Sequence, residues 1–335
     1  MFTPLKAICG AVMLHMATDN YLFTNGRILG ASNILFTGLQ QLITDPAEAI
    51  ASSNSLHVLF GMFLAGLSTF LFTPIFLPNY EAHAPWAPFG SWTNLIAGLL
   101  VGFGTKLGSG CTSGHMLCGI ARGSKRSFVA TCTFSVFAMA TARIVGSLPT
   151  CYDTAGNEVA CHNIAENYSA EIPYLAGLLG VIIVLRNVIP KLTSLPASTR
   201  ATMSSVFSGF AFGTGLLVSG LAAPQKTLGF LAGIPPKFDP SLAMVMLFGV
   251  LPNAISVWKS GFFKNVTPLL STEFSLPQIF DVTPRLIIGA AIFGIGWGVA
   301  GVCPGPGILG SFLDGLKGFS WLAGFIPAYY LAGKI

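Results

Sequence analysis

Nine apolar stretches recur along the chain, and each approaches the length that a helix needs to cross a lipid bilayer. A spanning helix takes about 20 mostly apolar residues. The stretches cover roughly residues 5–22, 54–77, 91–107, 124–148, 171–189, 200–220, 240–260, 284–302 and 318–333. The sequence therefore predicts an all-α polytopic membrane protein with about nine transmembrane helices, forming a single membrane domain over residues 1–335.

The charge content supports this prediction and excludes several other classes. Only 9% of the residues are charged and 53% are hydrophobic, whereas a soluble domain carries about 25% charged residues. Such a surface would leave large apolar patches in water, which argues against a soluble enzyme. The net charge of +5 is small and spread along the chain, so we expect the lipid bilayer and not nucleic acid as a partner.

Four further segments are too short to cross a membrane and too apolar for ordinary loops. They cover residues 26–42, 111–121, 222–232 and 304–315. Apolar runs of this length in a membrane protein are candidate re-entrant helices. Irregular backbone at membrane depth is tolerated only where protein buries it or where it lines an aqueous cavity. The four segments therefore predict a pathway through the protein.

Basic residues are distributed unequally between the two faces that nine spans create. Twelve lie on one face and five on the other, and cytoplasmic loops are the ones enriched in Lys and Arg. This bias places the N-terminus outside, the C-terminus in the cytosol and the protein in the cell membrane. The outer loop at about 150–170 carries Cys151 and Cys161, which we expect to pair in an oxidising compartment.

An internal similarity divides the chain into a first half, about residues 1–170, and a second half, about 171–335. Residues 102–111 (GFGTKLGSGC) and 294–303 (GIGWGVAGVC) both open with G-x-G and reach Cys nine positions after the first Gly. Under the predicted topology the halves have opposite orientations. The sequence thus predicts an inverted repeat, a design that places binding sites where interrupted helices meet.

The two cysteines of this repeat, Cys111 and Cys303, are the first candidate site residues. Each begins a short segment, where backbone N–H groups and the helix dipole favour thiolates and bound anions. Such a thiol can hold a soft sulfur species by hydrogen bonding or by transient sulfur contact. The alternative interpretation is a buried Cys acting as a small hydrophobe.

Residues around Cys111 extend the candidate site. His115 and Cys118 follow it at i+4 and i+7, so a helix would place all three near one face. The sequence leaves three interpretations open for His115: an anion donor, a ligand in a soft-metal site with the two thiols, or a buried histidine bonded to protein.

The neighbouring small and polar residues offer hydroxyls and close backbone approach, as a small-anion site needs. They are Gly110, Thr112, Ser113 and Gly114. Arg122 is a weaker candidate, since with Lys125 and Arg126 it either anchors the cytosolic interface or attracts an anion to the exit.

Several motifs resemble the YeeE/YedE family of sulfur transporters. They are GCTSGHMLCGIARGSKR at 110–126, SFVATCTF at 127–134, LVSGLAAPQKTLGFL at 217–231 and GVCPGPG at 301–307. The resemblance implies nine spanning and four short helices in an hourglass-shaped inverted repeat, and thiosulfate uptake through cysteines that Cys111 and Cys303 match. The thiosulfate members carry a further cysteine in the first short segment, where this chain has Ser32 and Asn33.

We therefore expect transport of a small inorganic sulfur compound through a cysteine relay. The compound is a thiosulfate-like anion, sulfite, sulfide or polysulfide, and a cytosolic sulfur-carrier protein is a candidate partner. The alternatives are a copper or zinc transporter that uses Cys111, His115 and Cys118, and a membrane thiol-redox protein. We expect no enzyme activity, resident metal or cofactor. No haem, flavin or nucleotide motif supports the redox alternative, since GFGTKLG at 102–108 does not match G-x-G-x-x-G.

Overall fold

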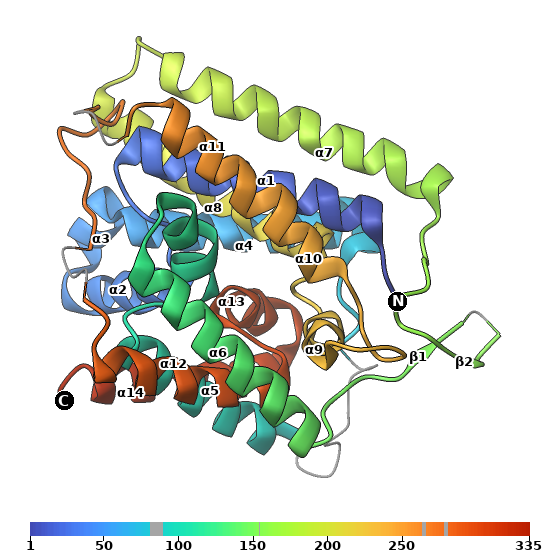
Figure 1. Ribbon diagram of the computed structural model, residues 1–335. Helices are drawn as coiled ribbons and strands as arrows, with labels where there is room; N and C mark the ends of the chain where they lie inside the picture. The colour runs from blue at the N-terminus through green and yellow to red at the C-terminus, as the bar shows by residue number, and fades with distance from the viewer. Residues whose placement is uncertain (81–89, 154, 263–265, 278–280) are drawn as a thin grey trace.

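The computed structural model describes residues 1–80, 90–153, 155–262, 266–277 and 281–335, and helices dominate it (Figure 1). The long helices lie side by side and coincide with the nine predicted spans, which confirms the all-α polytopic class. They are α1 (Pro4–Asn25), α4 (Asn54–Phe72), α5 (Gly90–Leu107), α6 (Lys125–Ile144), α7 (Tyr168–Val188), α8 (Ala197–Val218), α12 (Pro284–Ala300), α14 (Gly315–Ala332) and the continuous stretch α10 (Ser241–Val245), η5 (Met246–Val250) and α11 (Leu251–Lys259). By length and apolarity alone, six helical stretches of the described chain qualify as membrane spans.

All four short segments are helical. They are α2 (Ala31–Thr44), the pair η2 (Ser113–Gly119) and η3 (Ile120–Arg122), α9 (Pro224–Ala232) and α13 (Pro304–Leu313). The first starts later than the predicted residue 26 because Gly26 takes a left-handed conformation that ends α1. A further short helix, α3 (Pro46–Ser52), was not predicted; its start is capped by the Asp45 side chain, which accepts from the Glu48 N–H.

Helices of the two halves pack mainly against each other. Helix α5 packs on α12 and α14, and α1 packs on α8. Glycines permit this close approach: a Cβ on Gly102 would lie 2.3 Å from the Phe325 carbonyl oxygen, and one on Gly104 would lie 2.3 Å from the Phe293 nitrogen. Two further contacts match each other if α1 of the first half is equivalent to α8 of the second and α4 is equivalent to α10–α11. Helix α4 packs on α8, and α10–α11 packs on α1. The inverted orientation of the halves stays a prediction.

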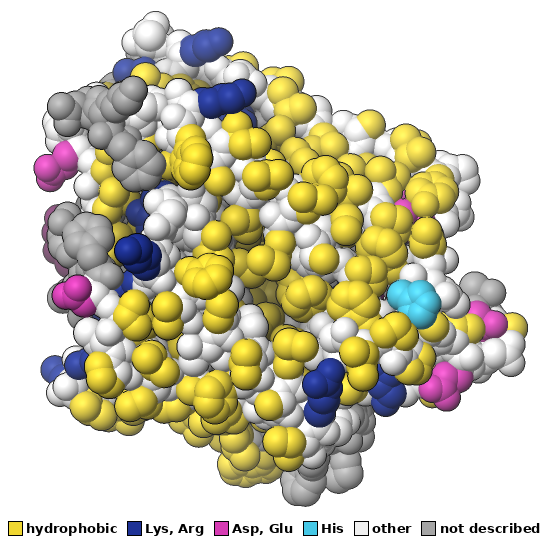
Figure 2. Space-filling model, in the orientation of Figure 1, with side chains coloured by type: hydrophobic (Ala, Val, Ile, Leu, Met, Phe, Trp, Pro, Cys, Tyr) yellow, Lys and Arg dark blue, Asp and Glu magenta, His cyan; other side chains and the backbone are white. Residues whose placement is uncertain are grey.

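The molecular surface is apolar over the helices, as a lipid-facing surface requires. Figure 2 shows hydrophobic side chains across most of one face, with charged side chains mainly toward its edges. Helix α7 lies along the outside of the bundle (Figure 1). Its exposed large apolar residues are Ile172, Val181, Ile183, Val184 and Val188. Because water would disfavour such a surface, the packing supports an integral membrane protein.

The two termini lie at opposite ends of the bundle (Figure 1). The N-terminal end carries a small hairpin, β1 (Cys151–Tyr152) and β2 (Glu158–Val159), which a disulfide between Cys151 and Cys161 closes. The expected pairing of these two cysteines is therefore present. The Phe2 N–H donates to the Asn163 carbonyl at 3.0 Å, which ties the chain start to this hairpin loop.

Candidate functional site

The starts of the four short segments converge inside the bundle. The Ala31 N–H at the start of α2 donates to Ser113 Oγ at 3.0 Å, which joins α2 to η2. The Thr112 hydroxyl donates to Cys303 Sγ at 3.4 Å, which joins η2 to the start of α13. The start of α9 lies close to Gly301, two residues before Cys303, since a Cβ on Gly301 would lie 2.6 Å from the Pro224 carbonyl oxygen.

A tight turn between α5 and η2 delivers Cys111 to this meeting point. The Gly110 N–H donates to the Thr105 carbonyl at 2.8 Å. A Cβ on Gly110 would lie 2.7 Å from His115 Nε2, so only glycine fits between the turn and that ring. Cys111 is 1% exposed, and its Sγ lies 3.3 Å from Ser113 Oγ.

The segment that follows Cys111 is a π-helix and not an α-helix over Ser113–Gly119. Single π turns occur inside helices and often mark functional positions. The first N–H groups of a helix have no partner within it, so those of Thr112, Ser113 and Gly114 can face a ligand. The His115 N–H still donates to the Cys111 carbonyl at 2.9 Å, an i+4 bond, and the wider turn follows it.

His115 is held by protein at both ring nitrogens. Its Nε2 lies 3.1 Å from the Gly108 carbonyl oxygen, and its Nδ1 lies 3.1 Å from Ser127 Oγ. A carbonyl only accepts, so Nε2 carries the hydrogen and Nδ1 accepts from the Ser127 hydroxyl. As placed, neither nitrogen is free to donate to an anion, and the contacts favour the interpretation as a buried, protein-bonded histidine.

Cys118 and Arg122 lie at the far end of the same segment. The Cys118 side chain is packed in the hydrophobic core, and its carbonyl accepts from Arg122 Nε at 3.1 Å. A cation at a helix C-terminus is favourable, so Arg122 stabilises the end of the segment. Within the described residues no group of three or more His, Cys, Asp or Glu side chains could hold a metal ion. No observation therefore favours the soft-metal alternative over the others.

The second cysteine occupies a different local structure. Cys303 is the N-cap residue of α13 and is only partly buried. Pro304 and Pro306 have no N–H, so Gly305 is the residue that supplies a backbone N–H among the first three residues of this helix. A Cβ on Gly307 would lie 2.4 Å from the Trp321 ring, so α13 packs tightly against α14.

A cavity opens beside the two segments. Its lining includes Thr112, Ser113, Met116, Trp297 and Cys303, among mostly apolar side chains. Trp297 is 3% exposed, and its indole N–H has no hydrogen-bond partner within the described residues. Of the predicted site residues, Thr112, Ser113 and Cys303 line this cavity, whereas Cys111, Gly110, Gly114 and His115 are not part of its lining.

A second cavity also borders the start of α13, since Pro306 lines both. Its polar lining comprises Tyr80, Asn94, Asp314, Lys317 and Trp321. A solute in either cavity therefore lies next to the start of α13, but Cys303 lines only the first cavity.

Ser32 lies at the start of α2, next to the bond between Ala31 and Ser113. It is 1% exposed, and its hydroxyl has no partner within the described residues. Space remains nearby, because a Cβ on Gly114 would meet nothing closer than the Gly30 Cα at 4.0 Å. A buried hydroxyl without a partner beside open space can bond a ligand.

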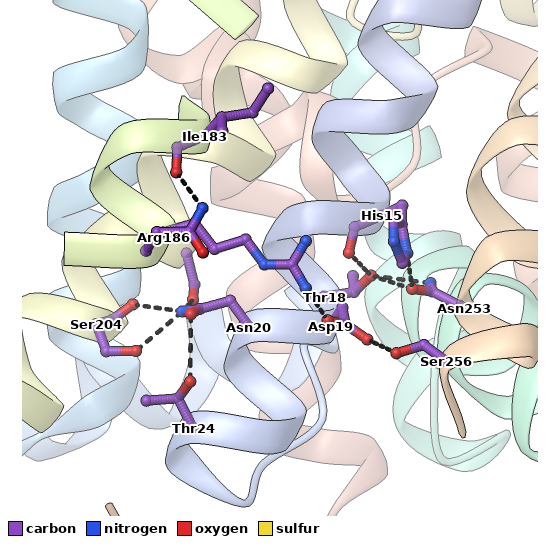
Figure 3. Close-up of polar contacts among 12 residues, drawn as sticks. His15, Thr18, Asp19, Asn20, Thr24, Ile183, Arg186, Ser204, Asn253 and Ser256 are labelled. Atoms are coloured by element: carbon purple, nitrogen blue, oxygen red, sulfur yellow. Dashed lines mark hydrogen bonds and ion pairs between the residues drawn. The ribbon is translucent and has the colours of Figure 1, made fainter. Parts of the chain in front are cut away.

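The structure adds a residue that the sequence interpretation missed. Asn253 of α11 donates from Nδ2 to the Leu117 carbonyl of η2 at 3.2 Å and to Thr18 Oγ1 at 2.9 Å. Its Oδ1 lies 2.7 Å from Nδ1 of His15 on α1 (Figure 3). The available signal was the presence of polar and ionisable residues inside predicted spans.

Interrupted helices that meet inside an all-helical, multi-pass bundle define a membrane transport protein, because binding sites of such proteins form where broken helices converge. The comparisons with known proteins agree. The model of the sulphur transport family matches residues 46–194, and that of a family of unknown function, DUF6691, matches residues 201–332. The chain belongs to the sulphur transport family, consistent with its YeeE/YedE motifs.

Curated relatives carry transporter names. A probable transporter of Xylella fastidiosa strain Temecula1 is 43% identical over 143 residues, which cover 42% of this chain and 93% of the relative. A probable transporter of strain 9a5c is 40% identical over 143 residues, with the same coverage of both chains. A further probable transporter of strain 9a5c is 36% identical over 118 residues, covering 34% of this chain and 77% of the relative.

Proposed function

We propose that this protein carries a small inorganic sulfur compound across the membrane and that Cys303 and Cys111 contact it in turn. One observation carries the proposal. The hydrogen bond from Thr112 to Cys303 Sγ joins the two short segments that bear the cysteines. A sulfur compound that leaves one thiol at this junction therefore meets the other segment directly.

Polar groups around the junction would replace the water that the compound loses. Removing an anion from water without partners is very costly. Hydroxyls of Ser113 and Ser32 and the N–H groups at the helix starts supply donors along the route, and the Thr112 hydroxyl holds Cys303 beside them. The thiols add a polarizable surface that suits sulfur over oxygen. Passage by contacts alone requires no covalent bond to form or break.

We also propose that the N-terminus faces outward and the C-terminus faces the cytosol in the cell membrane. The disulfide between Cys151 and Cys161 supports this orientation, because disulfides persist in oxidising compartments. Arg27, Arg285 and Lys334 lie on the face that the predicted topology assigns to the cytosol, which fits the positive-inside rule. A sulfur-carrier protein at that face stays a prediction.

The test is uptake of labelled thiosulfate, sulfite, sulfide and polysulfide into liposomes that contain the purified protein. We expect Cys303→Ser and Cys111→Ser each to lower uptake of the transported compound at least about tenfold, as loss of about 1.4 kcal/mol of binding at the barrier would do. Cys132→Ser is the matched control, since that cysteine is exposed on α6. Normal uptake of every compound by both variants would refute the relay.

A further inference from the structure

His15 is an ionisable side chain near the middle of α1. At 1.5 Å per residue it lies about 15 Å from the end of the helix at Asn25. Ionisable residues at this depth are costly, and in transporters they commonly mark ion or proton pathways. His15 is partly buried and turns toward α11, where its Nδ1 meets Asn253 (Figure 3).

The hydrogen bonds fix where the proton sits on the neutral ring. The Asn253 amide nitrogen donates to the Leu117 carbonyl, which can only accept, so Asn253 Oδ1 must be the atom that faces His15. His15 Nδ1 therefore carries the hydrogen and donates it. His15 Nε2 keeps its lone pair and has no hydrogen-bond partner within the described residues. This nitrogen can accept a proton.

The charged residue one turn from His15 on α1 is already paired. Asp19, one turn along α1, bonds Arg186 of α7 and Ser256 of α11 (Figure 3). The other titratable or charged side chains on elements that pack against α1 are Tyr168, Tyr174 and Glu171 on α7, with Glu171 bonded to Lys6 of α1, Arg200 on α8, Lys259 on α11, and His115 and Cys118 on η2. Helix α1 itself also carries Cys9 and Tyr21. Helix α10 and η5 carry none.

A continuous chain of hydrogen bonds leads from His15 to the segment of Cys111. Asn253 links the His15 ring to the Leu117 carbonyl, and Leu117 belongs to η2. A proton on Nε2 turns the bond from Nδ1 to Asn253 into a charge-assisted one, which is shorter and stronger. Protonation of His15 therefore changes the strength of its bond to Asn253, the amide that also bonds the Leu117 carbonyl of η2.

We propose that His15 is a proton-binding site that couples inward movement of the sulfur anion to a proton. This inference rests on the proposed transport function. An anion that moves inward works against an inside-negative potential. One proton taken up by the Nε2 lone pair on the outer side and released on the inner side compensates one negative charge. The step makes no bond to the anion and involves no oxidation.

The test uses liposomes whose membrane potential is clamped with potassium and valinomycin and whose interior is one pH unit above the medium. The probes are labelled thiosulfate and labelled sulfite. One coupled proton drives an accumulation of up to about tenfold, because one pH unit is a tenfold difference in proton concentration. We expect His15→Gln, which keeps an N–H for Asn253 but has no basic nitrogen, to give a ratio of about one.

The same variant should still exchange labelled for unlabelled anion at equal pH, because exchange moves no net proton. Asn253→Leu, which removes the link to Leu117, should also lose the response to the pH gradient. His57→Gln is the matched control: His57 is a buried histidine of α4 whose Nε2 meets the Ile50 carbonyl at 2.9 Å, and its variant should accumulate like wild type.

Three results would overturn the coupling. Wild-type protein that exchanges either probe but ignores the pH gradient refutes the coupling and leaves the transport function standing. Loss of exchange in His15→Gln, with His57→Gln intact, would place His15 in the permeation path instead. If wild-type protein transports neither probe in any assay, the proposed transport of these compounds is refuted, and the coupling is refuted with it.

Discussion

The two cysteine-bearing segments differ in how they present their thiols. The first, residues 111–122, places a fully buried Cys111 beside the Ser113 hydroxyl, and its first residues all carry an N–H. The second, residues 303–313, places a partly exposed Cys303 at a helix start where two of the first three residues are prolines. The first segment is rich in hydrogen-bond donors, and the second is an accessible thiol in mostly apolar surroundings.

This difference suggests that the second segment supplies the accessible thiol and the first segment supplies the hydrogen-bond donors. A solute in the cavity reaches Cys303 directly, because Cys303 lines it. The oxygen atoms of a sulfur anion would then find donors mainly on the first segment, at Ser113 and the backbone N–H groups of the helix start. Changes in the second segment should therefore act through packing, and changes in the first should act through polar contacts.

The largest effect is expected from a methyl group in the second segment. In Gly307→Ala the new Cβ would lie 2.4 Å from the Trp321 ring, which is 1% exposed and stacks on Phe325. We expect a loss of about 3 kcal/mol in the free energy of unfolding, the upper end for overpacked cores. Thermal unfolding in detergent measures it.

Gly114→Ala is the matched change in the first segment. Its Cβ would meet nothing closer than 4.0 Å, so stability should stay near wild type while uptake falls because the space is filled. Equal destabilisation by the two substitutions would contradict the contrast between the segments.

The next effect concerns the support of the first segment. His115→Ala removes both bonds of the ring and leaves the Gly108 carbonyl and the Ser127 hydroxyl without their partner. We expect a loss of about 2 kcal/mol in unfolding free energy, since unsatisfied buried groups cost about 1–3 kcal/mol. Ser127→Ala, which removes one of the two bonds, should cost less. A fully stable His115→Ala protein would show that the ring does not hold the turn.

The smallest effect is expected at the junction of the segments. Thr112→Val keeps the shape of the side chain but removes the hydroxyl that donates to Cys303 Sγ. One such bond contributes about 0.5–1.5 kcal/mol, so uptake should fall roughly twofold to tenfold with little change in thermal stability. Thr112→Ser should restore uptake. If the serine variant transports as poorly as the valine variant, the hydroxyl is not the relevant group.

The spans and short segments could be predicted from the sequence because hydrophobic length is a local property. Gly110 and Gly307 show what the local sequence cannot predict. It gives the glycine at each position, but not the ring of His115 or Trp321 that excludes a side chain there. The motif around Cys111 indicated site residues, yet the actual partners of His115 depend on a π turn. No periodicity in the sequence distinguishes that turn from an ordinary helix.

Long-range partners were equally invisible. Asn253 holds the Leu117 carbonyl across 136 positions of sequence, and nothing in the spacing of either residue relates them. The sequence could have indicated that a histidine and an asparagine inside apolar spans need partners. Which partner each one takes depends on how the helices pack.

The exchange of helices between the halves has a consequence for synthesis of the protein. Helix α5 packs against α12 and α14, and nearly 180 residues separate the end of α5 at Leu107 from the start of α12 at Pro284. At about 5–20 residues per second, translation leaves α5 without α12 for roughly 10–35 s and without α14 for longer. During that time the glycine-lined face of α5 has no protein partner in the membrane. Insertion of the first half alone therefore does not complete the core. A truncated chain would expose the surface that α12 and α14 normally cover.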